Sequence, residues 1–242
     1  MFFPLHDANP TMRPALLTGA LIALCVGVFV FWQLAVGLDQ SVFQAGLMPA
    51  LSGVFGTATA TDLAALAPPN FPTTALDSNL GLSAFISHMF MHGGWAHLLF
   101  NMYFLWMFGD NVEDRLGALP FLVFFVLTGL VAALAHIVAT GPSVIPMVGA
   151  SGAISGVMGA YAAMYPKAKV KCLLQGQIIF IPAWLLIAFW FARDVVMFMT
   201  NSGGNVANMA HIGGFVAGFV LIWFFPKRNY PAPAQLTRGP WR

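Results

Sequence analysis

The stretch PMVGASGAISGVMGAY, residues 146–161, decides the fold, because it reads as a membrane helix that is lined with small residues and begins near a serine. Ser151, Ser155 and Gly159 recur every four residues and therefore share one face of that helix. Faces of this kind let two helix axes approach closely inside a membrane. A membrane helix can satisfy a serine through its own backbone carbonyl, so the meaning of Ser151 depends on what else lies at its depth.

The composition identifies the class of protein. Of the 242 residues, 59% are hydrophobic and 7% are charged, whereas a soluble domain carries about 25% charged residues. We therefore expect an integral membrane protein. The net charge is +2 and the basic residues are scattered, so no nucleic-acid partner is expected. Cys25 and Cys172 fall in different segments and give no disulfide framework or metal spacing, so neither a metal nor another cofactor is expected.

The apolar segments predict the fold class. A spanning helix needs about 20 mostly apolar residues, and we expect an all-α polytopic membrane protein with six transmembrane helices in a bundle. The expected spans are residues 14–37, 90–109, 118–138, 148–165, 178–200 and 206–225.

The basic residues orient these spans, since cytoplasmic loops carry an excess of Lys and Arg. Those that fall on one side of the expected bundle are Arg13, Arg115, Lys167, Lys169, Lys171, Lys227, Arg228, Arg238 and Arg242. Arg193 lies elsewhere, near the outer end of the fifth span, where the adjacent Asp194 can neutralise it. We therefore place both termini in the cytoplasm.

This orientation divides the chain into three parts. Residues 1–13 are expected to be a cytoplasmic N-terminus, and residues 14–225 the six-span domain, with an external loop over 38–89. Residues 226–242 lack apolar periodicity, and we expect a disordered cytoplasmic tail there. No internal repeat of the kind found in many transporters is visible in the sequence.

Four polar residues are expected at one depth in the membrane. His97 and Asn101 lie four residues apart on the second span, Ser151 opens the fourth, and His211 lies a few residues into the sixth. At 1.5 Å per residue, all four fall within about 10 to 15 Å of the external ends of their helices. Each of them alone is more simply interpreted as part of a helix interface. A cluster at one level needs mutual hydrogen bonding or a water-filled cavity, and both indicate a site.

Glycine spacing predicts which helices meet. His211, Gly214 and Gly218 form one stripe on the sixth span, and Ser151 with Gly152 tops the small face of the fourth. If these faces pack together, the Ser151 hydroxyl comes within hydrogen-bond reach of the His211 ring. The alternative is that such stripes, which are common in membrane helices, mark packing only.

The same residues suggest acyl-transfer chemistry. A serine becomes nucleophilic beside a base, and a histidine can take and return the proton near neutral pH. Donors for the developing oxyanion are available from His97, Asn101 and the backbone N–H groups at the start of the fourth helix. The acids Asp110, Glu113 and Asp114 follow the second span on the cytoplasmic side. We therefore expect no carboxylate near the site, and a Ser/His dyad rather than a triad.

With these residues placed, the sequence resembles the rhomboid family of intramembrane serine proteases over about residues 90–225. Three motifs in order carry the resemblance: H-x4-H-x3-N at His92, His97 and Asn101, G-x-S-G at Gly149, Ser151 and Gly152, and A-H-x-x-G-x-x-x-G at Ala210, His211, Gly214 and Gly218. The resemblance implies Ser151 as nucleophile and His211 as general base and acid. It also implies an oxyanion hole formed by His97, Asn101 and the Ser151 amide, and a structural contact for Glu113 and Arg115.

The resemblance further implies the partners and the location. Substrates would be single-span membrane proteins whose helices unwind locally within the lipid bilayer. The active site would lie towards the external face of the membrane. A bacterial inner membrane is the expected location, and the oligomeric state stays open. Unlike some relatives, this chain has no Trp-Arg pair in the first external loop and no seventh span.

Ser155 is the departure that bears on the site. In the best-known bacterial members, an aromatic residue four positions after the nucleophile packs on the catalytic imidazole, and here that position is a serine. Another group has to orient His211. Asn208, three residues earlier on the sixth span, is the candidate in that span, and its alternative role is to cap the helix.

Three other functions compete with proteolysis. A non-catalytic relative that binds membrane clients would typically have lost the serine or the histidine. A channel or transporter lined by His88, His92, His97 and His211 lacks both repeats and an intramembrane acid. A metal site at His88 and His92 lacks the glutamate of H-E-x-x-H, and Gly93 with Gly94 interrupts the helix.

Overall fold

The computed structural model describes residues 2–68, 71, 79–200, 202 and 207–228. The helices are α1 (Leu16–Gly27), which continues through a π-helical segment (Val28–Gln33) into α2 (Leu34–Val36), then α3 (Leu38–Ala45), α4 (Ala60–Leu66), α6 (Ala84–Ser87), α7 (Trp95–Leu116), α8 (Ala118–Thr140), α9 (Ser151–Met164), α10 (Ala183–Met199) and α11 (Asn208–Leu221). Short 3₁₀ turns cover Pro49–Leu51, Gly81–Ser83, His88–Phe90 and Ile222–Phe224. Three strands, β1 (Phe2–Asp7), β2 (Lys169–Leu174) and β3 (Gln177–Pro182), form one antiparallel sheet in the order β1-β2-β3. Residues 229–242 of the expected tail, and residues 69–70 and 72–78 of the expected external loop, lie outside the described residues.

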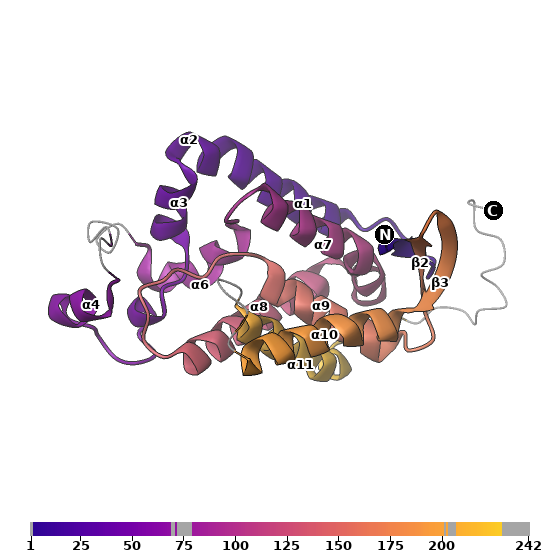
Figure 1. Cartoon of the computed structure of the whole chain (residues 1–242). Helices are drawn as coiled ribbons and strands as arrows, with labels where there is room; N and C mark the ends of the chain where they lie inside the picture. The colour runs from indigo at the N-terminus through magenta and orange to yellow at the C-terminus, as the bar shows by residue number, and fades with distance from the viewer. Residues whose placement is uncertain (1, 69–70, 72–78, 201, 203–206, 229–242) are drawn as a thin grey trace.

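Helix α9 is the central helix of the fold, and it packs against α7, α8 and, most extensively, α11 (Figure 1). Its approach to α11 is close enough to require glycine. A Cβ atom on Gly214 would lie 2.1 Å from the backbone oxygen of Gly152, and one on Gly218 would lie 1.9 Å from that of Gly156. Since real Cβ contacts are longer than this, the two helices meet backbone to backbone along this stripe.

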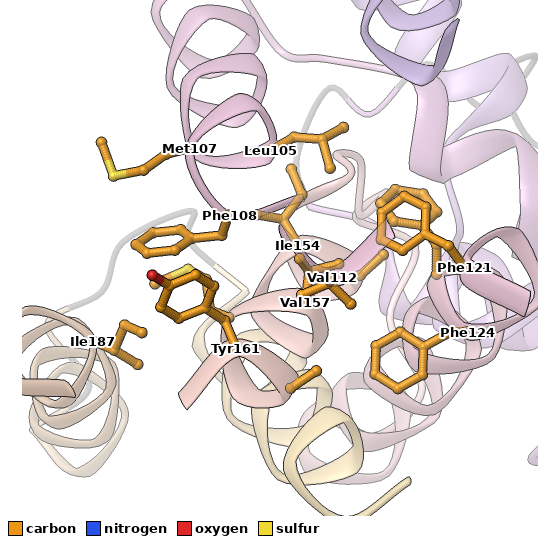
Figure 2. Packing of buried hydrophobic residues seen from close by; sticks show 14 of the residues in the cluster. Leu105, Met107, Phe108, Val112, Phe121, Phe124, Ile154, Val157, Tyr161 and Ile187 are labelled. Carbon is orange, nitrogen blue, oxygen red and sulfur yellow. The ribbon is translucent and has the colours of Figure 1, made fainter. Parts of the chain in front are cut away.

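A cluster of buried apolar side chains holds α9 against α7 and α8 (Figure 2). Tyr161 of α9 stacks edge-on against Phe108 of α7, with ring centroids 5.0 Å apart. The cluster includes Leu105, Met107, Val112, Phe121, Phe124, Ile154, Val157 and Ile187. Close packing of this kind stabilises a membrane bundle mainly through dispersion, because lipid tails are as apolar as the side chains. This packing fixes the position of α9, the helix that carries Ser151.

The three-stranded sheet is a feature that the all-α expectation did not contain. It lies at the end of the molecule opposite α4 (Figure 1). In β2, Val170 and Cys172 are buried, whereas Lys169 before them is exposed. This is the period of two expected of a strand with one buried face. The hairpin turns at Gln175 and Gly176, both with positive φ, at 49° and 84°. The sequence prediction assigned this segment to a loop and to the start of the fifth span, because the apolar residues of β3 run directly into those of α10.

Helix α7 extends further than the sequence predicted, to Leu116 rather than residue 109. Glu113 therefore lies within the helix, where its carboxylate is buried against the beginning of α1. It accepts hydrogen bonds from the Leu17 amide at 2.9 Å, the Thr18 amide at 2.6 Å and the Thr18 hydroxyl at 2.7 Å. An anion at a helix N-terminus satisfies the free N–H groups there and complements the helix dipole. Glu113 thus makes a structural contact away from Ser151.

The helices differ in how completely they could cross a membrane. Among the described residues, Leu16–Val36 and Ala118–Thr140 have both the length and the apolar character of a span, with mean hydropathy of 2.3 and 2.6. Asn208–Phe224 is a shorter apolar helix. The fold is a mostly helical bundle, and these segments supply its most apolar surfaces.

Candidate active site

Ser151 and His211 meet where α9 and α11 begin. Ser151 is the first residue of α9, and His211 lies one turn into α11. The Ser151 Oγ atom is 2.9 Å from Nε2 of His211, which is hydrogen-bond distance. The contact is possible because Gly214, three residues after His211, packs directly on the Gly152 backbone oxygen. The glycine stripe thus brings the hydroxyl and the ring together.

A carboxylate lies on the other side of the imidazole ring, which corrects the expectation that no acid is near. Asp194 Oδ2, from α10, is 3.1 Å from His211 Nδ1. The second carboxylate oxygen, Oδ1, pairs with Arg193 Nη1 at 3.1 Å, so the ion pair expected between these neighbours is confirmed. Asp194 is 8% exposed. The Ser/His pair is therefore extended to a third residue by an acid that the sequence interpretation treated as already neutralised.

His97 faces Ser151 across Gly149. Its Nδ1 atom accepts a hydrogen bond from the Gly93 amide at 3.3 Å, which leaves the proton of a neutral ring on Nε2. A Cβ atom placed on Gly149 would lie 2.7 Å from His97 Nε2 and 3.6 Å from Ser151 Oγ. Gly149 also has φ of +122°, a conformation that side chains other than glycine rarely adopt. Glycine at this position keeps open the space between a ring N–H donor and the serine hydroxyl.

Asn101 lies one turn after His97 on α7 and is 5% exposed. Its Nδ2 atom donates to the His97 backbone oxygen at 2.8 Å. The amide carries two hydrogens, so this contact uses one and leaves the other available. At the start of α9, the amides of the first turn have no acceptor within their own helix. His97 Nε2 and the backbone amides at the start of α9 thus offer N–H donors near Ser151.

Within the described part of the chain, no direct hydrogen bond joins Asn208 to His211. His211 Nδ1 is instead 3.1 Å from Asp194 Oδ2, which can accept its hydrogen bond. Asn208 is 7% exposed, and its side-chain oxygen has no hydrogen-bond partner among the residues that the structure describes. One signal in the sequence could have identified Asp194: it is an acid near the outer end of the fifth span, and so at the expected depth of His211.

A small cavity of about 10 Å³ lies beside Ser151. It is lined by His88, Met89, Gly129, Ala132, Met147, Val148, Gly149, Gly152, Ala153, Ala207 and Ala210. A cavity of this volume holds roughly one water molecule. Glycine and alanine residues form much of its wall. Because the cavity is this small, a group that enters beside the serine has to be small.

Comparisons with known proteins agree with this geometry. A family model described as the rhomboid domain matches residues 79–228, which is more than half of the chain. YdcA of Bacillus subtilis (strain 168) is 32% identical over 153 residues, covering 61% of this chain and 72% of YdcA. The rhomboid protease GlpG of Klebsiella pneumoniae (strain 342) is 28% identical over 216 residues, covering 89% of this chain and 63% of GlpG.

The rhomboid protease GlpG of Salmonella newport (strain SL254) is 30% identical over 137 residues, covering 57% of this chain and 46% of GlpG. The chain therefore spans less than two thirds of the length of these GlpG relatives. The matched region includes the helices that carry His97, Ser151, Asp194 and His211. On the family model and the similarity to YdcA, this chain belongs to the rhomboid family of intramembrane serine proteases.

Proposed function

We propose that this chain cleaves transmembrane segments of membrane proteins, with Ser151 as nucleophile and His211 as general base and acid. The observation that carries the proposal is the 2.9 Å contact between Ser151 Oγ and His211 Nε2 at the start of two closely packed helices. A serine and a histidine in this geometry can exchange a proton directly. No cofactor takes part in the proposed reaction.

The reaction proceeds in two steps, acylation of Ser151 and hydrolysis of the acyl-enzyme. As Ser151 Oγ attacks the scissile carbonyl carbon, its proton moves to His211 Nε2, and the carbonyl π electrons move to the oxygen. The tetrahedral intermediate collapses when the C–N bond breaks and His211 returns the proton to the leaving nitrogen. Water then repeats the sequence on the acyl-enzyme, which releases the new carboxylate and restores the serine.

Three donors are proposed for the oxyanion: the Nε2–H of His97, the side-chain amide of Asn101 and the backbone amide of Ser151. Support comes from the Gly93 contact, which leaves the His97 proton on Nε2, the nitrogen that faces Gly149. Removing one such donor typically costs about 3 kcal/mol of transition-state stabilisation. Gly149 contributes by leaving room beside the hydroxyl, and Gly152 by letting α9 pack closely on Ala132 of α8.

The proposed membrane orientation has six spans, with both termini in the cytoplasm and the site towards the external face of a bacterial inner membrane. Lys167, Lys169 and Lys171 support it, because they lie at the sheet and positive charge favours the cytoplasmic side. The sheet lies at the opposite end of the molecule from α4 of the first loop (Figure 1). Ser151, at the start of α9, would then lie near the external end.

The substrate proposed for this site is a transmembrane helix that unwinds locally. A carbonyl within an intact helix is already hydrogen-bonded and shielded by its neighbours, so it cannot reach Ser151 without unwinding. Small or helix-breaking residues near the cleaved bond favour that step. The small cavity beside Ser151 supports a small side chain at the cleaved bond.

The alternative is a rhomboid-like protein that binds and routes membrane clients without cleaving them. It is disfavoured because this chain retains both Ser151 and His211, with the two atoms in hydrogen-bond contact. A fluorophosphonate probe separates the two functions, since it reacts with a serine only when a base activates the hydroxyl. We expect wild-type protein to be labelled at Ser151 and Ser151→Ala not to be labelled. A wild-type chain that is folded, membrane-inserted and unlabelled would favour client binding.

A further inference from the structure

Asp194 is the one buried acid that contacts the proposed catalytic residues among those the structure describes. It belongs to α10, whereas Ser151 and His211 belong to α9 and α11. Its Oδ2 atom is 3.1 Å from His211 Nδ1, and on the far side of the ring Nε2 is 2.9 Å from Ser151 Oγ. Carboxylate, imidazole and hydroxyl thus stand in series, with the ring held at both nitrogens.

The Asp194 contact selects the tautomer of His211. An ionised carboxylate can only accept hydrogen bonds, so the nitrogen that faces it has to carry the proton. Because a neutral imidazole has a single N–H, Nδ1 then donates to Asp194 and Nε2 keeps its lone pair. That lone pair faces Ser151 Oγ, which is the arrangement a general base needs. With the other tautomer, Nε2 would carry a proton and could not accept the one from the serine.

Arg193 and Asp194 interact through an oxygen that the histidine does not use. Arg193 Nη1 contacts Oδ1, while His211 contacts Oδ2. A buried charge is costly unless it is paired, and the guanidinium supplies that pairing without displacing the imidazole. The Arg193 side chain is 37% exposed, against 12% for that of Asp194, so the cation lies on the outer side of the pair.

Ser155, one turn below Ser151, offers the His211 ring a hydroxyl and no aromatic face. Among the residues that the structure describes, the hydrogen bonds to the ring nitrogens come from two contacts, one to Asp194 and one to Ser151. Together they fix the rotation of the ring.

We propose that Asp194 is a positioning residue that holds His211 in the tautomer competent to accept the Ser151 proton and stabilises the imidazolium formed when it does. The inference rests on the proposed function of Ser151 and His211. In the step concerned, the proton leaves Oγ for Nε2 as the bond from Oγ to the carbonyl carbon forms. The Asp194 carboxylate then faces a ring that has become positively charged.

The contact also joins α10 to α11, so a purely structural role has to be distinguished. Phe191, one turn before Asp194, packs on Phe215 of α11 with ring centroids 4.7 Å apart. Phe191→Ala removes a packing contact between the same two helices and leaves the imidazole contacts in place. It is the matched control for the packing of α10 on α11.

The experiment compares the wild-type chain with Asp194→Ala, Asp194→Asn and Phe191→Ala, all purified in the same detergent. The measurements are kcat and KM on a model transmembrane substrate and the rate of fluorophosphonate labelling. Asp194→Asn keeps the shape of the side chain and keeps the test decisive if Asp194→Ala does not fold. Its amide can present an N–H to Nδ1, which favours the wrong tautomer.

We expect both Asp194 variants to lower kcat and the labelling rate by a factor on the order of 100 to 10,000, with KM changed by less than about threefold. Phe191→Ala should keep kcat and the labelling rate within about threefold of wild type. Full kcat in a folded Asp194→Asn would overturn the inference, and so would a drop of the same size in Phe191→Ala. Failure of the proposed function would look different, because the wild-type protein would then be neither labelled nor able to cleave the substrate. That result would overturn this inference as well.

Discussion

Replacing Gly214 by alanine perturbs the helix contact on which the Ser151–His211 pair depends. The new Cβ atom would lie 2.1 Å from the Gly152 backbone oxygen and 3.0 Å from its carbonyl carbon. Contacts shorter than 3.0 Å are essentially never found for a real Cβ atom, so α9 and α11 have to move apart by about 1 Å. Both atoms are backbone, so no side-chain rotation can relieve the clash.

The displacement acts directly on the site, because Gly152 is the residue after Ser151, and His211 is one turn before Gly214. The Ser151–His211 contact is 2.9 Å, and a shift of about 1 Å along it would exceed the range of a hydrogen bond. A misplacement of this size can cost about a hundredfold in rate. We therefore expect kcat of Gly214→Ala to fall by about a hundredfold, with the protein still inserted and folded.

The assay is cleavage of a model transmembrane substrate by purified protein, alongside thermal unfolding to confirm the fold. Gly27→Ala is the matched control, because it also adds a methyl group to a helical glycine and meets nothing within 4 Å. It should keep the wild-type rate. A folded Gly214→Ala protein that cleaves within threefold of wild type would refute the argument that this backbone contact sets the geometry of the pair.

Three further predictions concern other parts of the molecule. Asn101→Ala should lower kcat by about a hundredfold in the cleavage assay, the cost of one oxyanion donor, and full activity would place Asn101 in packing alone. Asn208→Ala should cleave within a few-fold of wild type, because Asp194 makes the contact to His211, and a drop as large as that of Asp194→Asn would contradict this. Burial, with the nearby Asp110 charge, raises the pKa of Asp7 in β1 from 3.8 to about 7. The protonated carboxyl therefore stabilises the folded protein fully below pH 3.8, and this stabilisation is lost as the pH rises through 7. Asp7→Asn, which stays neutral, should therefore unfold at a higher temperature than wild type at pH 8 and depend less on pH between 5 and 8, and a lower unfolding temperature at pH 8 would show that the charged carboxylate is needed there.

The packing of α9 on α11 is the part of the fold that local sequence patterns could predict. Small residues recur at helical spacing from Ser151 to Gly159 and from Gly214 to Gly218, and close approach of backbones is what small side chains permit. The shared depth of Ser151 and His211 follows from helix rise alone. The structure places these two residues in contact at 2.9 Å.

Asp194 could not be assigned in the same way, because its partner lies on another helix. The sequence shows an adjacent Arg193, and a local ion pair is enough to explain an acid at a membrane boundary. The rotation of α10 decides that Asp194 Oδ2 faces His211 of α11. Spacing within one helix carries no information about it.

The sheet and the N-terminal segment were missed for a related reason. β1 pairs with β2 across more than 160 residues, with Phe3 opposite Leu173, and such pairing leaves only a short alternating pattern in each strand. Asp7 then accepts a hydrogen bond from Tyr161 at 2.8 Å. That contact ties the N-terminus to α9, the helix that carries Ser151. Long-range contacts between polar side chains of this kind have no signature in the local sequence.

The central claim is that Ser151 and His211 act as one catalytic unit. It is tested most directly by measuring cleavage of one model transmembrane substrate by wild type, Ser151→Ala, His211→Ala and the double variant. Residues that act as a unit lose activity non-additively, so each single variant should fall to background and the double variant should be no worse than either. Cleavage by Ser151→Ala above the background of substrate alone would contradict the account.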